Sequence, residues 1–229
     1  MNSAPMPRRL SEAFASLIGL KGLFIVVYFA FSMTLDQTLT GLMESELLNP
    51  DGASAIIWVY GGLSFVLGLL TPLVMAFVII SAWRFPHEST FDVAQKHLGY
   101  LVKEEMRVMG KSLLWGLLLL IPGLIRFFQC LFVPFVVLLD PQYQRGEVDA
   151  LQASWSRVKR VWARLLGLFI FFGLVTPLLM TFFDGYRSIL EQPLTALPLF
   201  LVELTVLIVF QWSVLKTWEK ANEPHISMV

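Results

Sequence analysis

The chain has 229 residues, of which 56% are hydrophobic, and its mean hydropathy is +0.69. Its 17 basic and 17 acidic residues balance, so the net charge does not favour nucleic acid as a partner. Its single cysteine, Cys130, excludes an internal disulfide. Several apolar runs reach the roughly 18 residues that mark a spanning helix. We therefore expect an all-α polytopic membrane protein, with residues 1–229 in one membrane-embedded domain.

The first apolar run, Leu17 to Leu35, follows two arginines and is interrupted by Lys21. It is longer than the core of a signal peptide, and no small-residue cleavage site follows it. We expect a retained first helix, from which the Lys21 ammonium reaches the membrane surface.

The second apolar run, Ala55 to Trp83, places Ser64 and Gly68 on one helix face, which allows another helix to approach closely. The loop before this run is predicted to be acidic and to contain Asp36, Glu44, Glu46 and Asp51. The loop after it is basic. Since positive charge favours the cytoplasmic side, we expect the N-terminus inside and the acidic loop outside.

The segment from Ser89 to Gly110 has the pattern of an amphipathic helix. Ser89 and Asp92 fit a capping motif. Apolar residues fall roughly on one face: Phe91, Ala94, Leu98, Leu101, Val102 and Met109. We expect this helix to lie along the inner membrane surface.

The next apolar stretch, residues 112–139, is broken by Pro122-Gly123 and contains Arg126. A single crossing would put the following basic loop outside, against the charge rule. Two full crossings would need about 40 residues. A re-entrant hairpin turning at Pro122-Gly123 satisfies both constraints, and the alternative is one long kinked helix.

A second amphipathic segment, residues 147–168, precedes the last two apolar runs, Leu165 to Phe183 and Leu194 to Leu215. Its aromatic and basic residues suit contact with an anionic inner leaflet, and the same charges would also suit an ordinary cytoplasmic loop. The candidate lipid contacts are Trp155, Arg157, Lys159, Arg160, Trp162 and Arg164. The expected plan is four spanning helices, one broken helix and two interfacial amphipathic helices.

The sequence GLLTPLVMAF at Gly68 to Phe77 recurs as GLVTPLLMTF at Gly173 to Phe182. Together with a weaker match upstream, the similarity fits an internal duplication of 17–82 and 121–183, as in many transporters. The alternative is two independent proline kinks, each with the threonine hydroxyl bonded to a carbonyl that the proline frees.

Arg126 and Glu203 are the ionisable residues deepest in apolar sequence. A charge inside the membrane is costly, so we expect the two to pair, with help from Gln129 and Gln211. Such a pair would be either a polar site for a head group or proton, or a structural lock. The sequence shows no catalytic, metal-binding or cofactor-binding motif, and we expect no enzyme and no cofactor.

The residues Ile121 to Arg126, Asp140-Pro141 and the A-L-x-x-S-W segment from Ala150 to Trp155 resemble YciC-like bacterial membrane proteins. They are also similar to the membrane domains attached to some glycerophosphodiester phosphodiesterases. The resemblance covers the second half of the chain, and VKRVWARLLG replaces the Lys-Gly pair that often follows. It implies a multi-helix protein of the bacterial inner membrane, with no assigned reaction.

Two hypotheses follow. In the first, the protein is a non-enzymatic scaffold, envelope factor or partner subunit, with membrane lipids, other membrane proteins or a second copy as partners. In the alternative, it is a small transporter or lipid-handling protein with an intramembrane site at Arg126 and Glu203.

Overall fold

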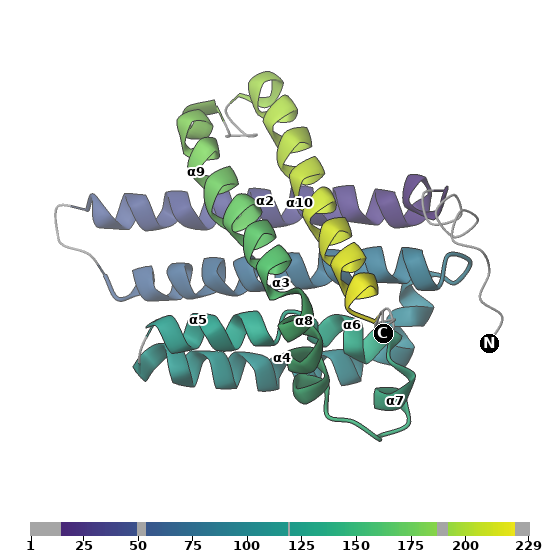
Figure 1. Ribbon diagram of the computed structural model, residues 1–229. Coiled ribbons are helices and arrows are strands. Elements are labelled where there is room, and N and C mark those ends of the chain that lie inside the picture. Colours follow the sequence, from purple (N-terminus) through teal and green to yellow (C-terminus); the bar gives the residue numbers. More distant parts are fainter. Residues whose placement is uncertain (1–14, 50–53, 119, 187–191, 223–229) are drawn as a thin grey trace.

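The computed structural model describes residues 15–49, 54–118, 120–186 and 192–222, and within these ranges the ordered elements are helices (Figure 1). Four helices are long and apolar enough to cross a membrane. They are α2 (Leu20–Leu47), α3 (Ile56–Arg84), the composite Ala150–Phe183, and α10 (Pro193–Asn222). A shorter apolar stretch, Ile125–Leu139, is bent. The predicted all-helical membrane fold with four spanning helices is confirmed.

Helices α2 and α3 lie side by side and antiparallel (Figure 1). The first helix is longer than predicted, because the sequence between Asp36 and Leu47 contains no proline to end it. Three of the four acidic residues predicted in a loop therefore lie on α2, and Asp51 lies outside the described residues. Asp36 is thus carried on a helix, facing its neighbours in the bundle.

Lys21 joins the beginning of α2 to the end of α3. Its ammonium donates to the carbonyl oxygen of Ser81 at 3.1 Å and to that of Phe85 at 2.6 Å. These carbonyls lie in the last turn of α3 and at its C-cap, and each also accepts a backbone N–H. Lys21 is only 5% exposed, so its ammonium is turned into the protein and not toward the surface as predicted.

The segment predicted as a surface helix continues without a break into the apolar stretch, forming α4 (Thr90–Leu118). The predicted cap is present, because Ser89 Oγ accepts from the Asp92 N–H at 3.1 Å. Helix α5 (Leu120–Gln129) returns alongside α4, so the two form a hairpin (Figure 1). Pro122 and Gly123 lie inside α5, and the predicted position of the turn is wrong. A proline in the first turn of a helix breaks no hydrogen bond.

The buried face of α4 differs from the predicted apolar face. Val93, Leu101 and Val108 pack into the core. Leu101 also belongs to the predicted apolar face, whereas Phe91 and Val102 of that face are 76% and 48% exposed. Helix α4 therefore has one apolar strip against the protein and a second strip facing outward.

The bend in the hairpin's second arm separates α5 from α6 (Val133–Leu139), which is buried from Val133 to Leu138. Ser154 bridges the bend: its hydroxyl donates to the Gln129 carbonyl at 2.8 Å and accepts from the Phe132 N–H at 3.2 Å. Asp140 then caps the short helix α7 (Pro141–Gln144) by accepting from the Gln142 N–H at 2.9 Å. The D-P and A-L-x-x-S-W residues thus stabilise this bend and its exit.

The second amphipathic segment and the fourth apolar run form one kinked rod. It comprises α8 (Ala150–Ile170), the π-helical turn η1 (Phe171–Val175), α9 (Thr176–Met180) and η2 (Thr181–Tyr186). Val161, with φ −130°, makes the kink that separates the amphipathic part from the membrane run. The rod and α10 slant across the other helices (Figure 1).

Candidate functional site

A cavity of about 750 Å³ lies between the helices, and we call it the central cavity. Residues from all four candidate spans line it, together with residues of α4 and of the bent stretch from α5 to α6. Most of the wall is apolar. Its larger apolar members are Phe29, Met33, Leu67, Leu73, Phe127, Leu131, Phe135, Phe169, Phe172, Leu207 and Phe210.

The two copies of the G-L-x-T-P-L motif line the central cavity from opposite parts of the chain. Thr71-Pro72 lies on α3, and Thr176-Pro177 lies at the start of α9, after the π-helical turn. The Thr71 hydroxyl donates to the Leu67 carbonyl at 2.9 Å, and the Thr176 hydroxyl donates to the Phe171 carbonyl at 3.0 Å. The prediction that these hydroxyls bond to carbonyls freed by the prolines is wrong, because Pro72 and Pro177 free the carbonyls of Gly68 and Gly173 and the observed acceptors are Leu67 and Phe171. Both proline-containing segments meet the same space.

A small set of polar side chains joins these cavity walls. The Ser32 hydroxyl of α2 lies 2.6 Å from the Thr71 hydroxyl of α3. The Gln211 amide of α10 donates to the Pro72 carbonyl at 3.1 Å. These bonds tie α2 and α10 to the proline kink of α3.

The predicted small-residue face of α3 is used inside the protein. Ser64 donates a hydrogen bond to Asp36 on α2. Gly68 lines the central cavity, and a Cβ atom added there would meet no atom within 4 Å. The close approach expected at this face therefore occurs at Ser64, whereas Gly68 leaves open space.

Three carboxyl side chains line the cavity, each from a different helix: Asp36 from α2, Glu105 from α4 and Glu203 from α10. Its described lining residues include no lysine, arginine or histidine. The carboxyls are spread around the wall on three different helices. Within the described ranges, no three His, Cys, Asp or Glu side chains are grouped so as to hold a metal ion. The cavity is apolar with separated acidic points.

The adjacent residues Glu104 and Glu105 have opposite environments. Glu104 accepts from Arg107 at 2.6 Å and from the Tyr143 hydroxyl at 3.3 Å. Glu105 Oε1 is buried and makes no hydrogen bond with the part of the chain that is described. Burial, and secondly the charge of Glu104, raise the pKa of Glu105 from 4.5 to about 7. This cavity carboxyl is therefore partly protonated near neutral pH.

The predicted polar residues lie in two separate places in the structure. Glu203 and Gln211 line the central cavity. Arg126 is exposed on α5, where it donates to Gln129 Oε1 at 3.0 Å and lies over the Trp115 ring at 5.5 Å. Since Arg126 lies outside the cavity wall, the arrangement does not place it in one polar site with Glu203.

Arg157, predicted to contact lipid, is a structural residue. Its side chain is 16% exposed, forms an ion pair with Asp140, and donates to Asn222 Oδ1 at 2.7 Å. Its guanidinium lies 4.7 Å from the centre of the Trp218 ring. Arg157 therefore joins α8 to the end of α6 and to the last turn of α10.

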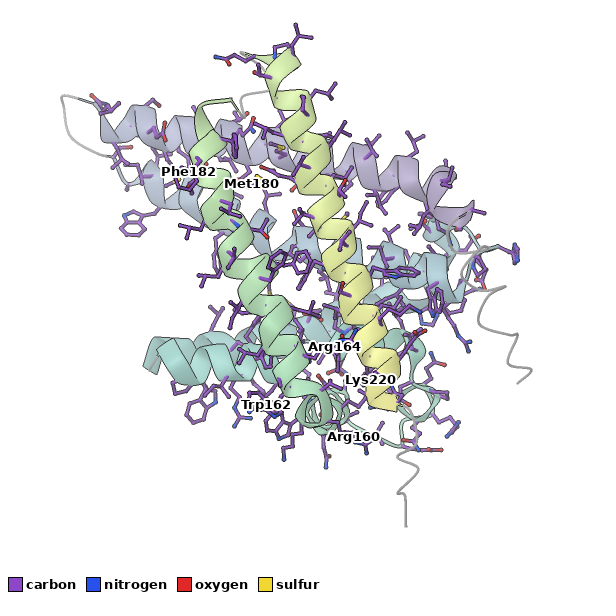
Figure 2. All side chains as sticks on the ribbon, turned by 45° about the horizontal axis from the view of Figure 1, so that its top comes forward. Arg160, Trp162, Arg164, Met180, Phe182 and Lys220 are labelled. Atoms are coloured by element: carbon purple, nitrogen blue, oxygen red, sulfur yellow. The ribbon has the colours of Figure 1, made fainter. Side chains whose placement is uncertain are left out.

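The other candidate lipid contacts of α8 are more accessible. Lys159, Arg160, Trp162 and Arg164 are exposed, whereas Trp155 packs partly against the core. Figure 2 shows Arg160, Trp162 and Arg164 at the same end of the rod and α10 as Lys220, away from Met180 and Phe182. The end of these two helices that carries Arg160, Arg164 and Lys220 is therefore basic.

Sequence reasoning missed two of the three cavity carboxyls. The sequence pattern placed Asp36 in a loop, and the only signal against this placement was that no proline ends the helix between Asp36 and Leu47. Glu105 stands beside Glu104 on a helix with two apolar strips, and the pattern did not tell which glutamate is turned inward. Glu203, singled out by its position in an apolar run as one half of a pair with Arg126, lines the cavity.

Comparison with known proteins gives no relative: no family model, no curated protein and no solved structure matches this chain.

Proposed function

We propose that the chain is a bacterial inner-membrane protein of the transporter or lipid-handling class, which binds an amphiphilic molecule in the central cavity without catalysing a reaction. The observation that carries the proposal is the cavity itself, about 750 Å³ in volume and bounded by all four candidate spans. Its size falls within the roughly 300–1,000 Å³ typical of small-molecule sites.

The lining matches an amphiphile better than a water-soluble solute. Its phenylalanine, leucine and methionine side chains would cover an apolar tail, whereas Asp36, Glu105, Glu203 and the hydroxyl of Ser32 would meet a polar head. Sites with mostly apolar walls and a few placed polar groups hold such ligands in a fixed orientation.

Irregular helices at the cavity wall support a transport or transfer role. Pro72 removes one backbone hydrogen bond inside α3, and a π-helical turn precedes Pro177 in the rod. Such interruptions free backbone groups and let the two halves of a helix move against each other. Transporter sites are commonly built where membrane helices are discontinuous.

The proposed orientation has the N-terminus and the basic end of α8 and α10 at the cytoplasmic face. Positive charge at that end and the resemblance to YciC-like proteins support it. In this orientation Lys159, Arg164 and Trp162 lie at an anionic leaflet. In a Cys130→Ser background, an impermeant thiol reagent added outside cells should label Ser45→Cys and not Gln144→Cys. Labelling of both would contradict the orientation.

The ligand proposal is tested with two matched substitutions on α3. Gly68 lines the cavity and Gly62 does not, yet a Cβ atom at either position would meet no atom within 4 Å. Gly68→Leu should fill part of the cavity, whereas Gly62→Leu should leave it open. Native mass spectrometry of the purified protein, after incubation with a mixture of nonionic, anionic and cationic long-chain amphiphiles, should show a bound amphiphile in the wild type and Gly62→Leu and much less in Gly68→Leu. Equal binding in all three would refute the proposal.

A scaffold or partner-subunit role is the second candidate, and the outer face of α3 favours it. Gly62 is exposed there beside Val59, Leu63 and Val66, which are 56%, 51% and 47% exposed. This small and apolar face suits close packing of another helix. A partner protein lost from the purified complex on Gly62→Leu and retained on Gly68→Leu would support this role.

A further inference from the structure

We propose that the molecule bound in the central cavity is an amphiphilic cation, such as a protonated long-chain amine or a lipophilic onium ion. The inference rests on the proposed function, because it names the chemical class of the ligand at that same site. It comes from the combination of a partly open cavity between the helices, aromatic walls and the sign of the charges around it.

The charges of the lining have one sign. Asp36, Glu105 and Glu203 approach the cavity from three different helices, and its described lining residues include no basic side chain. A phosphate head group would therefore meet carboxylates and no cation. A positively charged head group would gain favourable interactions on several sides, which are strengthened where water is excluded.

The aromatic residues of the lining suit a large, weakly hydrated cation. They are Phe29, Phe127, Phe135, Phe169, Phe172 and Phe210. The face of an aromatic ring attracts a cation, and onium ions are commonly recognised by several rings around them. Because phenylalanine has no hydrogen-bonding group, these rings also favour an apolar periphery around the charge.

Hydrogen bonds hold two walls of the cavity in place before any ligand binds. Ser64 donates to Asp36, which fixes this carboxylate against α3. The Gln211 amide donates to the Pro72 carbonyl at 3.1 Å and so holds α10, the helix that carries Glu203, to α3. Two of the acidic points are therefore on helices already fastened around the cavity, which lowers the cost of ordering on binding.

The test uses two probes of nearly the same size and shape and of opposite charge, tetraphenylphosphonium and tetraphenylborate. Binding is measured by equilibrium dialysis with the protein in phosphatidylcholine nanodiscs, and empty nanodiscs give the partition into lipid. The protein should bind the phosphonium at least about tenfold more tightly than the borate, a difference of the size expected for a few charge interactions in a partly buried site.

Isosteric variants connect this preference to the cavity. Asp36→Asn and Glu203→Gln should each weaken phosphonium binding by about tenfold, the loss expected for one favourable charge interaction of this kind. Glu44→Gln is the matched control, because Glu44 is exposed on α2 and is absent from the lining. It should leave phosphonium binding unchanged, and an equal loss in all three variants would overturn the inference.

The outcomes separate failure of the inference from failure of the proposed function. If both probes bind equally and Gly68→Leu weakens both, the cavity is a ligand site without a preference for cations, and only the inference fails. If neither probe binds above the empty nanodisc, or Gly68→Leu has no effect on either, the cavity is not a ligand site and both fail.

Discussion

The buried carboxyl of Glu105 gives the chain a stability that depends on pH. Because the pKa of Glu105 is raised from 4.5 to about 7, the folded protein favours the protonated form of this group. The stability is therefore complete below about pH 4.5 and falls as the pH rises through 7. Glu105→Gln keeps the shape of the protonated carboxyl and removes the ionisation.

The size of the effect follows from the difference between the two pKa values. One pKa unit is worth about 1.4 kcal/mol, so the interval from 4.5 to about 7 corresponds to about 3 kcal/mol at pH 8. Relative to the wild type, Glu105→Gln should be more stable by up to about 3 kcal/mol at pH 8 and nearly equal at pH 4.5.

Thermal unfolding of the purified protein in detergent, at a series of pH values from 4.5 to 8, measures this difference. Glu44→Gln serves as the control, because Glu44 is exposed on the same bundle and its replacement should not change the pH profile. A wild type and a Glu105→Gln variant with parallel profiles would refute the reasoning, since Glu105 would then be well solvated.

Two further predictions concern the bend at α6. Ser154→Ala removes both hydrogen bonds across the α5–α6 bend and should lower the free energy of unfolding by about 2 kcal/mol, whereas exposed Ser156→Ala should cost under about 0.5 kcal/mol. Arg157→Gln leaves the buried Asp140 carboxylate without its ion pair and should lower the free energy of unfolding by about 3 kcal/mol. Arg160→Gln removes the bond of an exposed side chain to the Ala221 carbonyl and should lower it by about 1 kcal/mol. Thermal unfolding in detergent checks both, and equal losses within either pair would count against the assigned roles.

The spanning helices could be predicted from the sequence because hydrophobic length alone decides them. The bilayer requires about 20 apolar residues and an internally bonded backbone, and the four long runs meet both conditions. The kink in α8 also had a signal, since the change from an amphipathic to a uniformly apolar pattern lies close to Val161.

The hairpin shows where local signals mislead. Pro122-Gly123 is the strongest breaker in its stretch, yet it lies in the first turn of α5, where proline is tolerated. The chain turns instead between the end of α4 and the start of α5. A separate bend at Cys130 to Phe132 comes just before Pro134, in the first turn of α6, and Ser154 from another helix holds it. Proline thus stands in the first turn of both α5 and α6, and the sequence alone does not tell how the chain is directed before each.

The candidate site was only partly predictable for a similar reason. An ionisable residue deep in an apolar run, such as Glu203, must find a polar or aqueous surrounding, and the sequence identifies it. Asp36 and Glu105 lie in mixed sequence, where either face of the helix could be turned inward. Packing of α2 against α3, and of α4 against α5 and α6, decides which carboxyl reaches the cavity.

Reaction of the single cysteine tests most directly whether the central cavity holds a ligand. Cys130 lines the cavity and is 7% exposed, so its alkylation by N-ethylmaleimide reports access to that space. With the protein in phosphatidylcholine nanodiscs, tetraphenylphosphonium should slow this reaction in the wild type and in Gly62→Leu, and should have little effect in Gly68→Leu. Binding of the probe with no protection of Cys130 in any of the three proteins would contradict the account, because the binding site would then lie elsewhere.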